Sequence, residues 1–284
     1  MVKVKNVYLI ILLVFVSIAI STAQSAESHQ IFTESLKKSN FKKLLKKAKN
    51  ADVIFFGEMH NDPISHWLQL KLIKELDKDN NLIVGLEMFE RDNQEALNNY
   101  LDGSIDAKKL EEDARLWNNY KTDYAPIVDY AKENDIKVIA SNIPRTYASM
   151  VYKQGFESIE SLVAEEKAYI APLPIPYDAS LPGYVKMLNM MEGHAGENFP
   201  KSQAVKDATM AYSINENYET NKKFVHLNGK YHSDNFEGII WYLNEYNPAL
   251  KVLTISTDMT DTPKSELAKA DFIILVDKDM TKTY

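Results

Sequence analysis

Six short apolar runs recur along the chain, each of strand length and rich in Val, Ile, Leu and Phe. They cover residues 53–56, 82–86, 136–140, 224–227, 252–255 and 272–276. Each run is apolar at nearly every position rather than at alternate positions, which is typical of strands covered on both faces. Segments with a helical pattern lie between most of them. The pattern therefore predicts an α/β fold with a mainly parallel central sheet and helices on both faces.

The helical segments are predicted at residues 63–78, 92–100, 107–116, 125–133, 144–152, 202–220 and 234–245. Two of the starts carry a recognisable cap. Asn61 and Asp62 precede Pro63, which fits a cap followed by proline at the first helical position. Asp234 stands three residues before Glu237, a variant of the capping box. The lysine-rich stretch 37–49 also has helical spacing and is interpreted as a solvated helix face.

The stretch from 171 to 200 has a different composition, since five prolines punctuate it and tyrosines and methionines lie between them. It is predicted to be an insertion with a short helix around 184–191, of the kind that often forms a lid or binding loop. Within it Met187, Met190, Met191 and His194 fall at i, i+3, i+4 and i+7, so one helix face would present thioethers and an imidazole together.

The first 23 residues combine a basic start, an apolar run of about 13 residues and a small-residue ending, as a secretory signal peptide does. The run is shorter than the roughly 20 residues that span a bilayer. We therefore expect residues 24–284 to form a single exported domain, periplasmic or extracellular. No cysteine follows the cleavage site, so a lipid anchor through cysteine is not expected.

The charge and the cysteine content exclude several classes of function. The formal net charge is -7, the wrong sign for binding to the phosphates of DNA or RNA, so nucleic acid is not an expected partner. The chain contains 0 cysteines, which excludes disulfide scaffolds, iron–sulfur clusters, thiolate metal sites and cysteine nucleophiles. Any metal must therefore be held by nitrogen and oxygen ligands.

A local motif occurs twice: a strand, then GxxH, then a capping residue and a helix. The first copy runs from Gly57 to His60 and the second from Gly229 to His232. A histidine between a parallel strand and the following helix lies at the carboxyl end of the strand, where open α/β sheets build ligand sites. We therefore expect both imidazoles at one edge of the sheet.

Glu87 and Arg145 follow two other strands and are expected at the same edge. His60, His232 and Glu87 would suit a divalent ion with open positions, with Glu58 as the base that deprotonates a bound water. Such a site would make the protein a metal-dependent hydrolase. The alternative is that the glutamates cap helices or pair with Arg145 and that the histidines are hydrogen-bonded loop residues.

The three remaining histidines outside the insertion have simpler interpretations. His29 is expected in an unstructured N-terminal stretch and His66 in solvent on the first turns of a helix. His226 lies inside a strand and is expected to be a core histidine with satisfied hydrogen bonds.

Several segments together resemble the ChaN family of haem-binding uptake proteins, in the larger Tiki, TraB and EreA-like superfamily. They are Phe56-Gly-Glu-Met-His60, Leu86-Glu-Met-Phe-Glu-Arg91, Trp117 with Asp123-Tyr-Ala-Pro-Ile127, Ala140-Ser-Asn-Ile-Pro-Arg145, Gln203 to Met210, and His226-Leu-Asn-Gly-Lys-Tyr-His232. The resemblance covers about residues 51–243 in the expected order.

The resemblance implies two alternative functions. Some superfamily members are metal-dependent peptidases or cleave esters, and there Glu58, His60, Glu87 and His232 map onto site positions. The ChaN branch instead implies haem binding for iron acquisition, with a homodimer and outer-membrane uptake machinery as partners. ChaN proteins are lipoproteins, and this sequence departs from them by lacking the lipobox cysteine.

A haem site needs an apolar or aromatic slot, an axial Tyr, His or Met, and cations for the propionates. Arg145 is the candidate for a propionate. Tyr147, Tyr231 and His194 are candidates for the axial ligand, beside the methionines of the insertion. Haem binding at the carboxyl edge of the sheet is the preferred hypothesis. The metal-dependent hydrolase and a binding module for another small ligand or a protein stay as alternatives.

Overall fold

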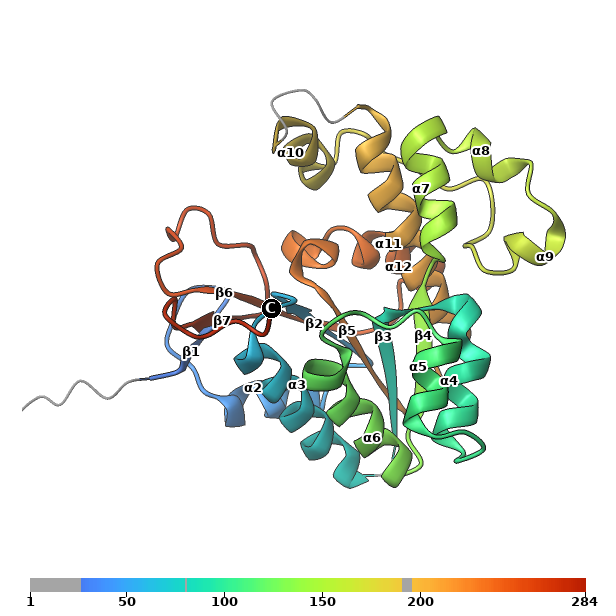
Figure 1. Cartoon of the computed structure of the whole chain (residues 1–284). Helices are drawn as coiled ribbons and strands as arrows, with labels where there is room; N and C mark the ends of the chain where they lie inside the picture. Colours follow the sequence, from blue (N-terminus) through green and yellow to red (C-terminus); the bar gives the residue numbers. More distant parts are fainter. Residues whose placement is uncertain (1–26, 80, 191–195) are drawn as a thin grey trace, which may run out of the picture.

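The apolar runs form one sheet. The structure is a computed structural model that describes residues 27–79, 81–190 and 196–284. Its seven strands lie in the order β1-β7-β6-β2-β5-β3-β4 (Figure 1). They are β1 (His29–Thr33), β2 (Val53–Glu58), β3 (Leu82–Glu90), β4 (Lys137–Asn142), β5 (Lys223–Gly229), β6 (Val252–Met259) and β7 (Phe272–Val276). Only β1 is antiparallel to its neighbour, so the predicted mainly parallel sheet is confirmed.

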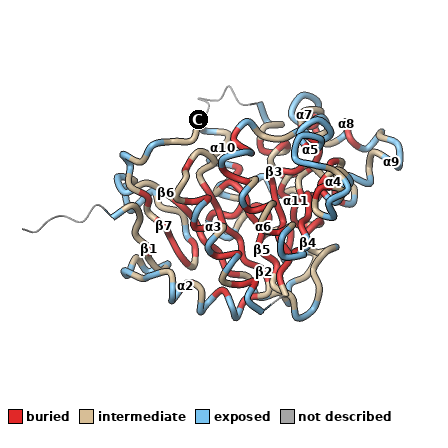
Figure 2. Tube along the Cα trace, turned by 60° about the horizontal axis from the view of Figure 1, so that its bottom comes forward, coloured by how far each residue is buried: buried red, intermediate tan, exposed pale blue. Residues whose placement is uncertain are grey.

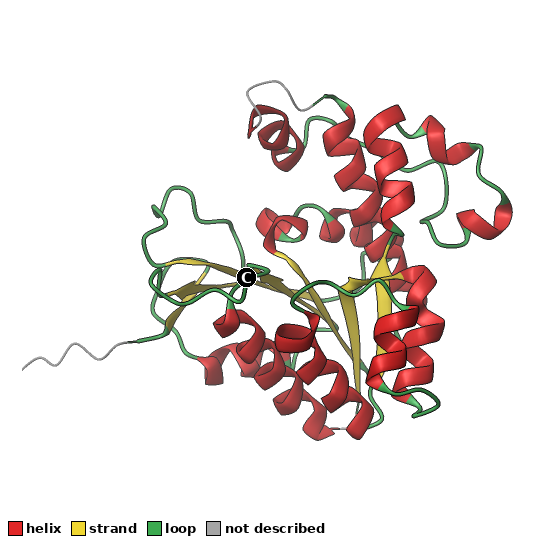
Figure 3. Cartoon of the chain, viewed as in Figure 1, coloured by secondary structure: helices red, strands yellow, loops and turns green. Residues whose placement is uncertain are grey.

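Helices cover both faces of this sheet, as predicted (Figure 3). One face packs against α2 (Phe41–Ala48), α3 (Pro63–Leu76), α4 (Gln94–Leu101), α5 (Ala107–Asp113) and α6 (Ala125–Glu133). The other packs against α7 (Arg145–Gln154), α11 (Asn198–Asn217) and α12 (Ile239–Tyr246). In β2, Ile54 and Phe56 belong to the first apolar cluster and Val53 and Phe55 to the second. Burial on both faces explains the unbroken apolar runs (Figure 2).

Short helices lie between α7 and α11 in the sequence. They are α8 (Glu157–Glu160), α9 (Ala164–Lys167) and α10 (Pro182–Met190). The described part of the segment 171–200 packs on the second cluster through Ala171, Ile175 and Tyr184. The predicted short helix is present as α10. Met191 and His194 lie outside the described residues, so the predicted face of thioethers and imidazole is not described.

Three local predictions are wrong. His29 begins a strand, because β1 pairs with β7 along the edge of the sheet. His66 is 5% exposed rather than solvated. Asp234 does not cap a helix: its Oδ1 accepts a hydrogen bond from Ser256 Oγ, and α12 begins only at Ile239 after Gly238, whose φ is 58°.

The cap at Asp62 is confirmed. Its side chain accepts from the backbone N–H of Ser65 at 2.7 Å, and Pro63 is the first residue of α3. The predicted signal peptide, residues 1–23, lies outside the described residues. Among the residues that the structure describes, no helix is long and apolar enough to span a bilayer.

Candidate functional site

The carboxyl ends of β2, β5 and β3 lie side by side and bring the two GxxH motifs together. β5 pairs with both β2 and β3, so Gly229 lies between the strand that leads to His60 and the strand that carries Glu87. A Cβ placed on Gly229 would lie 2.7 Å from Nε2 of His60 and 3.7 Å from Oε2 of Glu87. Glycine therefore lets the imidazole lie against the backbone beside Glu87.

Glu58 holds His60 from the other side. Its Oε1 lies 2.9 Å from Nδ1 of His60 and accepts a hydrogen bond from the hydroxyl of Tyr124 at 2.6 Å. Its Oε2 accepts from Nε2 of Gln69 at 2.5 Å and lies 3.4 Å from Nδ1 of His66. Burial alone would raise the pKa of Glu58, but the hydrogen bonds from the two histidines outweigh it and hold this pKa far below its usual range. Such a carboxylate is a weak base, which argues against Glu58 as a general base.

His232 forms a second network on the opposite side of the sheet edge. Its Nε2 lies 3.2 Å from Oε1 of Glu87 and its Nδ1 lies 2.5 Å from Oδ1 of Asp207. Oε2 of Glu87 accepts from the backbone N–H of Gly229 at 2.6 Å. Burial disfavours a charged imidazole, but Glu87 and Asp207 outweigh it and raise the pKa of His232 to about 10. The same contacts lower the pKa of Glu87 to about 2.

The contacts of His232 bear on the metal hypothesis. Carboxylates occupy both of its nitrogens: Nε2 lies 3.2 Å from Glu87 and Nδ1 lies 2.5 Å from Asp207. Among residues 27–79, 81–190 and 196–284, no group of three or more His, Asp and Glu side chains could hold a metal ion. The geometry of His60, Glu87 and His232 therefore gives the metal-dependent hydrolase no support.

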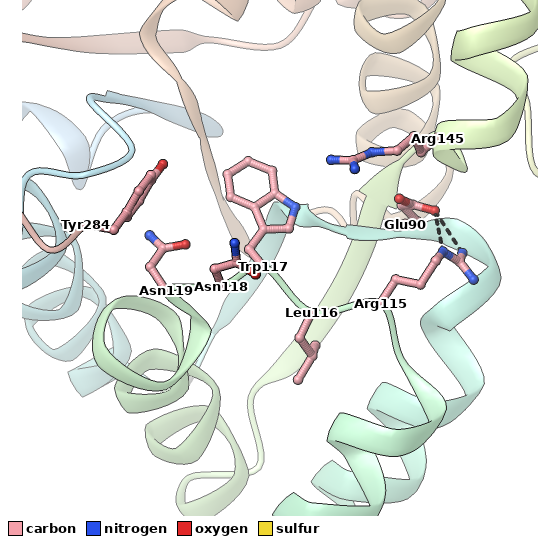
Figure 4. A pocket seen from close by; sticks show the side chains of 8 residues that line it. All are labelled: Glu90, Arg115, Leu116, Trp117, Asn118, Asn119, Arg145 and Tyr284. Carbon is pink, nitrogen blue, oxygen red and sulfur yellow. Dashed lines mark hydrogen bonds and ion pairs between the residues drawn. The ribbon is translucent and has the colours of Figure 1, made fainter.

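A cavity of about 620 Å³ opens between Trp117 and Arg145 (Figure 4). Trp117 forms one wall, and its ring lies edge-to-face with the imidazole of His60, with centroids 4.8 Å apart. Tyr284, the last residue of the sequence, lies across the cavity from Arg145. The remaining lining residues are Glu90, Arg115, Leu116, Asn118 and Asn119.

The two arginines of this cavity differ in their surroundings. The guanidinium of Arg115 is neutralised by Glu90, at 2.8 Å, and by Asp92. Arg145 is the exposed first residue of α7, and its guanidinium extends over the cavity toward Trp117 (Figure 4). Among the described side chains it has no ion-pair or hydrogen-bond partner, so the alternative in which Arg145 pairs with a glutamate is not observed there. The guanidinium of Arg145 is therefore available to contact an anion in the cavity.

The other predicted haem residues lie elsewhere. The hydroxyl of Tyr147 donates to Glu166 at 3.5 Å, and its ring packs on the second apolar cluster. Tyr231 is 65% exposed and lines a second cavity, under α10. His194 is outside the described residues. His226 is a fully buried core histidine bonded to Ser141 and Asn228, as predicted.

Sequence reasoning missed several residues that hold the two histidines. Asp207, Tyr124 and Gln69 are buried and bond to His232 or Glu58. Asp207 had a signal, because it is a charge on the buried stripe of α11 between Val205 and Ala208. A charge there needs a buried partner. No comparable signal marks Tyr124 or Gln69, since both residue types are common on helices that are partly buried.

Comparison with known proteins agrees with the resemblance. A structure described as cofacial heme binding to ChaN of Campylobacter jejuni has a TM-score of 0.68 and 20% identity, over 89% of this chain and 98% of that one. This likeness shows the fold. A structure of an erythromycin esterase EreC mutant has a TM-score of 0.47 and 11% identity, over 88% of this chain and 83% of that one. That likeness is too weak to bear on activity.

Among curated proteins, Protein RETICULATA-RELATED 5, chloroplastic, of Arabidopsis thaliana is 29% identical over 139 residues. The match covers 46% of this chain and 19% of that protein, so the chain spans about a fifth of the length of this relative. A family profile described as haem-binding uptake, Tiki superfamily, ChaN matches residues 44–243. The chain thus belongs to the ChaN family of haem-binding uptake proteins in the Tiki superfamily.

Proposed function

We propose that this chain binds haem in the cavity between Trp117 and Arg145 and serves haem or iron acquisition after export. Membership of a haem-binding family supports the ligand class. The observation that carries the choice of cavity is Arg145, a guanidinium without a partner among the described residues, on the wall opposite Tyr284. Haem carries two propionates, and a free guanidinium binds a carboxylate by two parallel hydrogen bonds.

The residues of this cavity fit the rest of the ligand. The indole of Trp117 supplies an apolar wall for the porphyrin, and Leu116 adds to it. Tyr284 is 66% exposed and is the tyrosine of this cavity, so its hydroxyl is the oxygen donor available to iron. His60 faces Gly229 and Glu87 and is held by Glu58, so in the proposal it supports Trp117 and does not contact iron. Haem, when bound, supplies the redox-active iron.

The test is a haemin titration of residues 24–284, followed in the Soret region. We expect saturable binding of haem, and we expect Arg145→Gln to weaken it about tenfold, as the loss of one charged contact does. Arg115→Gln is the matched control, since the same residue type lines the same cavity but is already neutralised by acids. Its dissociation constant should change by less than about threefold.

Tyr284→Phe tests the iron contact separately. We expect the charge-transfer bands of a phenolate-bound ferric haem to disappear while the porphyrin is still bound. Absence of any Soret change at stoichiometric haemin would remove the proposed function. If Arg145→Gln and Arg115→Gln lowered the affinity for haemin equally, the proposed contact between Arg145 and a propionate would be wrong. Export is tested by N-terminal sequencing of the secreted chain, which should begin near residue 24.

A further inference from the structure

A second cavity, of about 710 Å³, lies on the other side of His232. It opens between α10, α11, the turn after β5 and the loop that follows β6. His60 and Trp117 do not line it, and neither do Arg145 and Tyr284, to which the proposed function assigns the haem contacts. The two cavities are therefore separate sites of the same sheet edge, and the second has no role in the proposed haem binding.

Two buried polar atoms at the wall of this cavity have no hydrogen-bond partner among the described residues. They are Oδ2 of Asp207 and the hydroxyl of Tyr184, which lies near the hydroxyl of Tyr242 without forming a hydrogen bond of normal geometry. Asp207 is 1% exposed and Tyr184 is 4% exposed. An unpaired buried oxygen costs about 1–3 kcal/mol, and such groups in native proteins usually have a water or ligand partner. Both atoms therefore point to a polar group that belongs in this cavity.

Charge decides the nature of that group. Asp207 and Glu87 share one imidazolium, His232, so with both carboxylates ionised this buried trio carries an excess negative charge. Burial raises the pKa of Asp207, and a cation bound beside it would stabilise its ionised form. Lys230 is already bound by Asp258 at 2.6 Å and by Asp234 at 3.3 Å. The acids that line the cavity are Asp207, Asp234, Glu237, Asp258 and Glu266, against Lys186 and Lys230. An anion such as a haem propionate would be repelled, whereas a cation that donates hydrogen bonds would be attracted.

The remaining walls are partly apolar. Met187 of α10, Phe199 of α11 and the loop residues Leu181 and Leu267 line them, together with the uncharged polar residues Gln203, Asn235, Thr262 and Ser265. A cavity that combines acids with apolar side chains selects an amphipathic ligand. We propose that this cavity binds a small primary amine with an aromatic or alkyl body, whose ammonium group donates to Oδ2 of Asp207 and to Tyr184. An ammonium has three donors and can satisfy both oxygens at once.

Phenethylamine is the probe for this proposal. Titrated into residues 24–284 by calorimetry, it should bind with a dissociation constant below about 1 mM. 2-Phenylethanol has the same shape without the charge, and 3-phenylpropionate carries the opposite charge. Both should bind at least tenfold more weakly. The imidazole signals of His232 in the NMR spectrum should shift on binding, because Asp207 bridges the ligand and this ring.

Three variants locate the site. Tyr184→Phe removes an unpartnered hydroxyl, so it should fold normally and bind the amine about fivefold to tenfold more weakly. Asp207→Asn should weaken binding at least tenfold. Glu266→Gln removes an exposed acid from the rim of the same cavity and should change binding less than about threefold.

Haemin titration of Tyr184→Phe separates this proposal from the haem site, since haem affinity should not change. The proposal is overturned if phenethylamine does not bind, if the alcohol or the acid binds as tightly as the amine, or if Tyr184→Phe binds it like the unmodified chain. Loss of haem binding with intact amine binding would refute only the proposed function.

Discussion

His66 shows how one buried side chain ties stability to pH. Its Nδ1 lies 3.4 Å from Glu58 and its Nε2 3.4 Å from Asp123. Burial lowers the pKa of this imidazole, but the two carboxylates outweigh it and raise the pKa from 6.5 to about 9. The folded chain therefore holds a proton here that the unfolded chain releases. Its stabilisation is fully present below pH 6.5 and is lost as the pH rises through about 9.

We expect the free energy of unfolding to fall by about 3 kcal/mol between pH 6.5 and pH 9.5 through His66 alone. Urea unfolding at both pH values measures it. His66→Gln should reduce this fall, although His232 continues to contribute up to about pH 10. His226→Gln is the control, because burial lowers the pKa of His226 to about 4, so the folded chain keeps this imidazole neutral throughout this range. An unchanged pH dependence in His66→Gln would contradict the prediction.

His66 also shows what the sequence could not predict. His66 follows a cap and a proline on α3 and looks solvated, yet the helix turns it toward Glu58. The sequence did place His60, Glu87 and His232 at one edge, because strand ends in a parallel sheet meet there. It could not show which distant side chains hold this site. Asp207, which contacts His232, comes from α11, and Tyr124, which donates to Glu58, comes from the helical turn before α6.

At the scale of elements, the sequence predicted the buried apolar strands with nearly their observed bounds. It did not predict the strand and the helix start that carry few apolar residues. β7 (Phe272–Val276) was predicted with its observed bounds, and the strands buried on both faces began within a residue of the prediction. β1 was missed because only Ile31 of its five residues is buried, so it carries no apolar run. The start of α12 was misplaced because Asp234 bonds across the sheet to Ser256, a contact that local sequence does not reveal.

The cap of α3 gives the prediction at this scale. Asp62 is fully buried, and it caps the helix that follows His60. Asp62→Ala should destabilise the chain by about 2 kcal/mol, because both the helix N–H and the Nζ of Lys282 lose a buried partner. Urea unfolding is the measurement. Asp106→Ala removes the same kind of cap from α5 in an exposed position and should cost less than about 1 kcal/mol.

Haem affinity separates these two cap variants further. Asp62 fixes the backbone two residues after His60, whose ring contacts Trp117 in the proposed haem cavity. Asp62→Ala should therefore weaken haemin binding a few-fold, whereas Asp106→Ala should not. If Asp62→Ala and Asp106→Ala had the same free energy of unfolding and the same affinity for haemin, the cap at Asp62 would not contribute to haem binding.

At the scale of the whole molecule, segments distant in sequence meet at the proposed haem cavity. Thr283 donates from its backbone N–H to the carbonyl of Asn61 at 3.1 Å and from its hydroxyl to Asp123 at 2.8 Å. Lys282 lies 3.4 Å from the carboxylate of Asp62. These contacts join the last residues of the sequence to the turn that carries His60, and they place Tyr284 at the cavity (Figure 4).

We therefore expect a chain that ends at Thr281 to keep its fold and lose most of its haem affinity. Two hydrogen bonds and one partly exposed ion pair are worth about 1–3 kcal/mol, a fraction of the stability of a domain of this size. Loss of Tyr284 should raise the dissociation constant for haemin at least tenfold. Thr283→Ala, which keeps Tyr284 but removes the bond to Asp123, should lie between the truncated and the full chain. If truncation lowered the melting temperature sharply but left haemin binding intact, the tail would be a structural clasp and the iron contact would have to come from another residue.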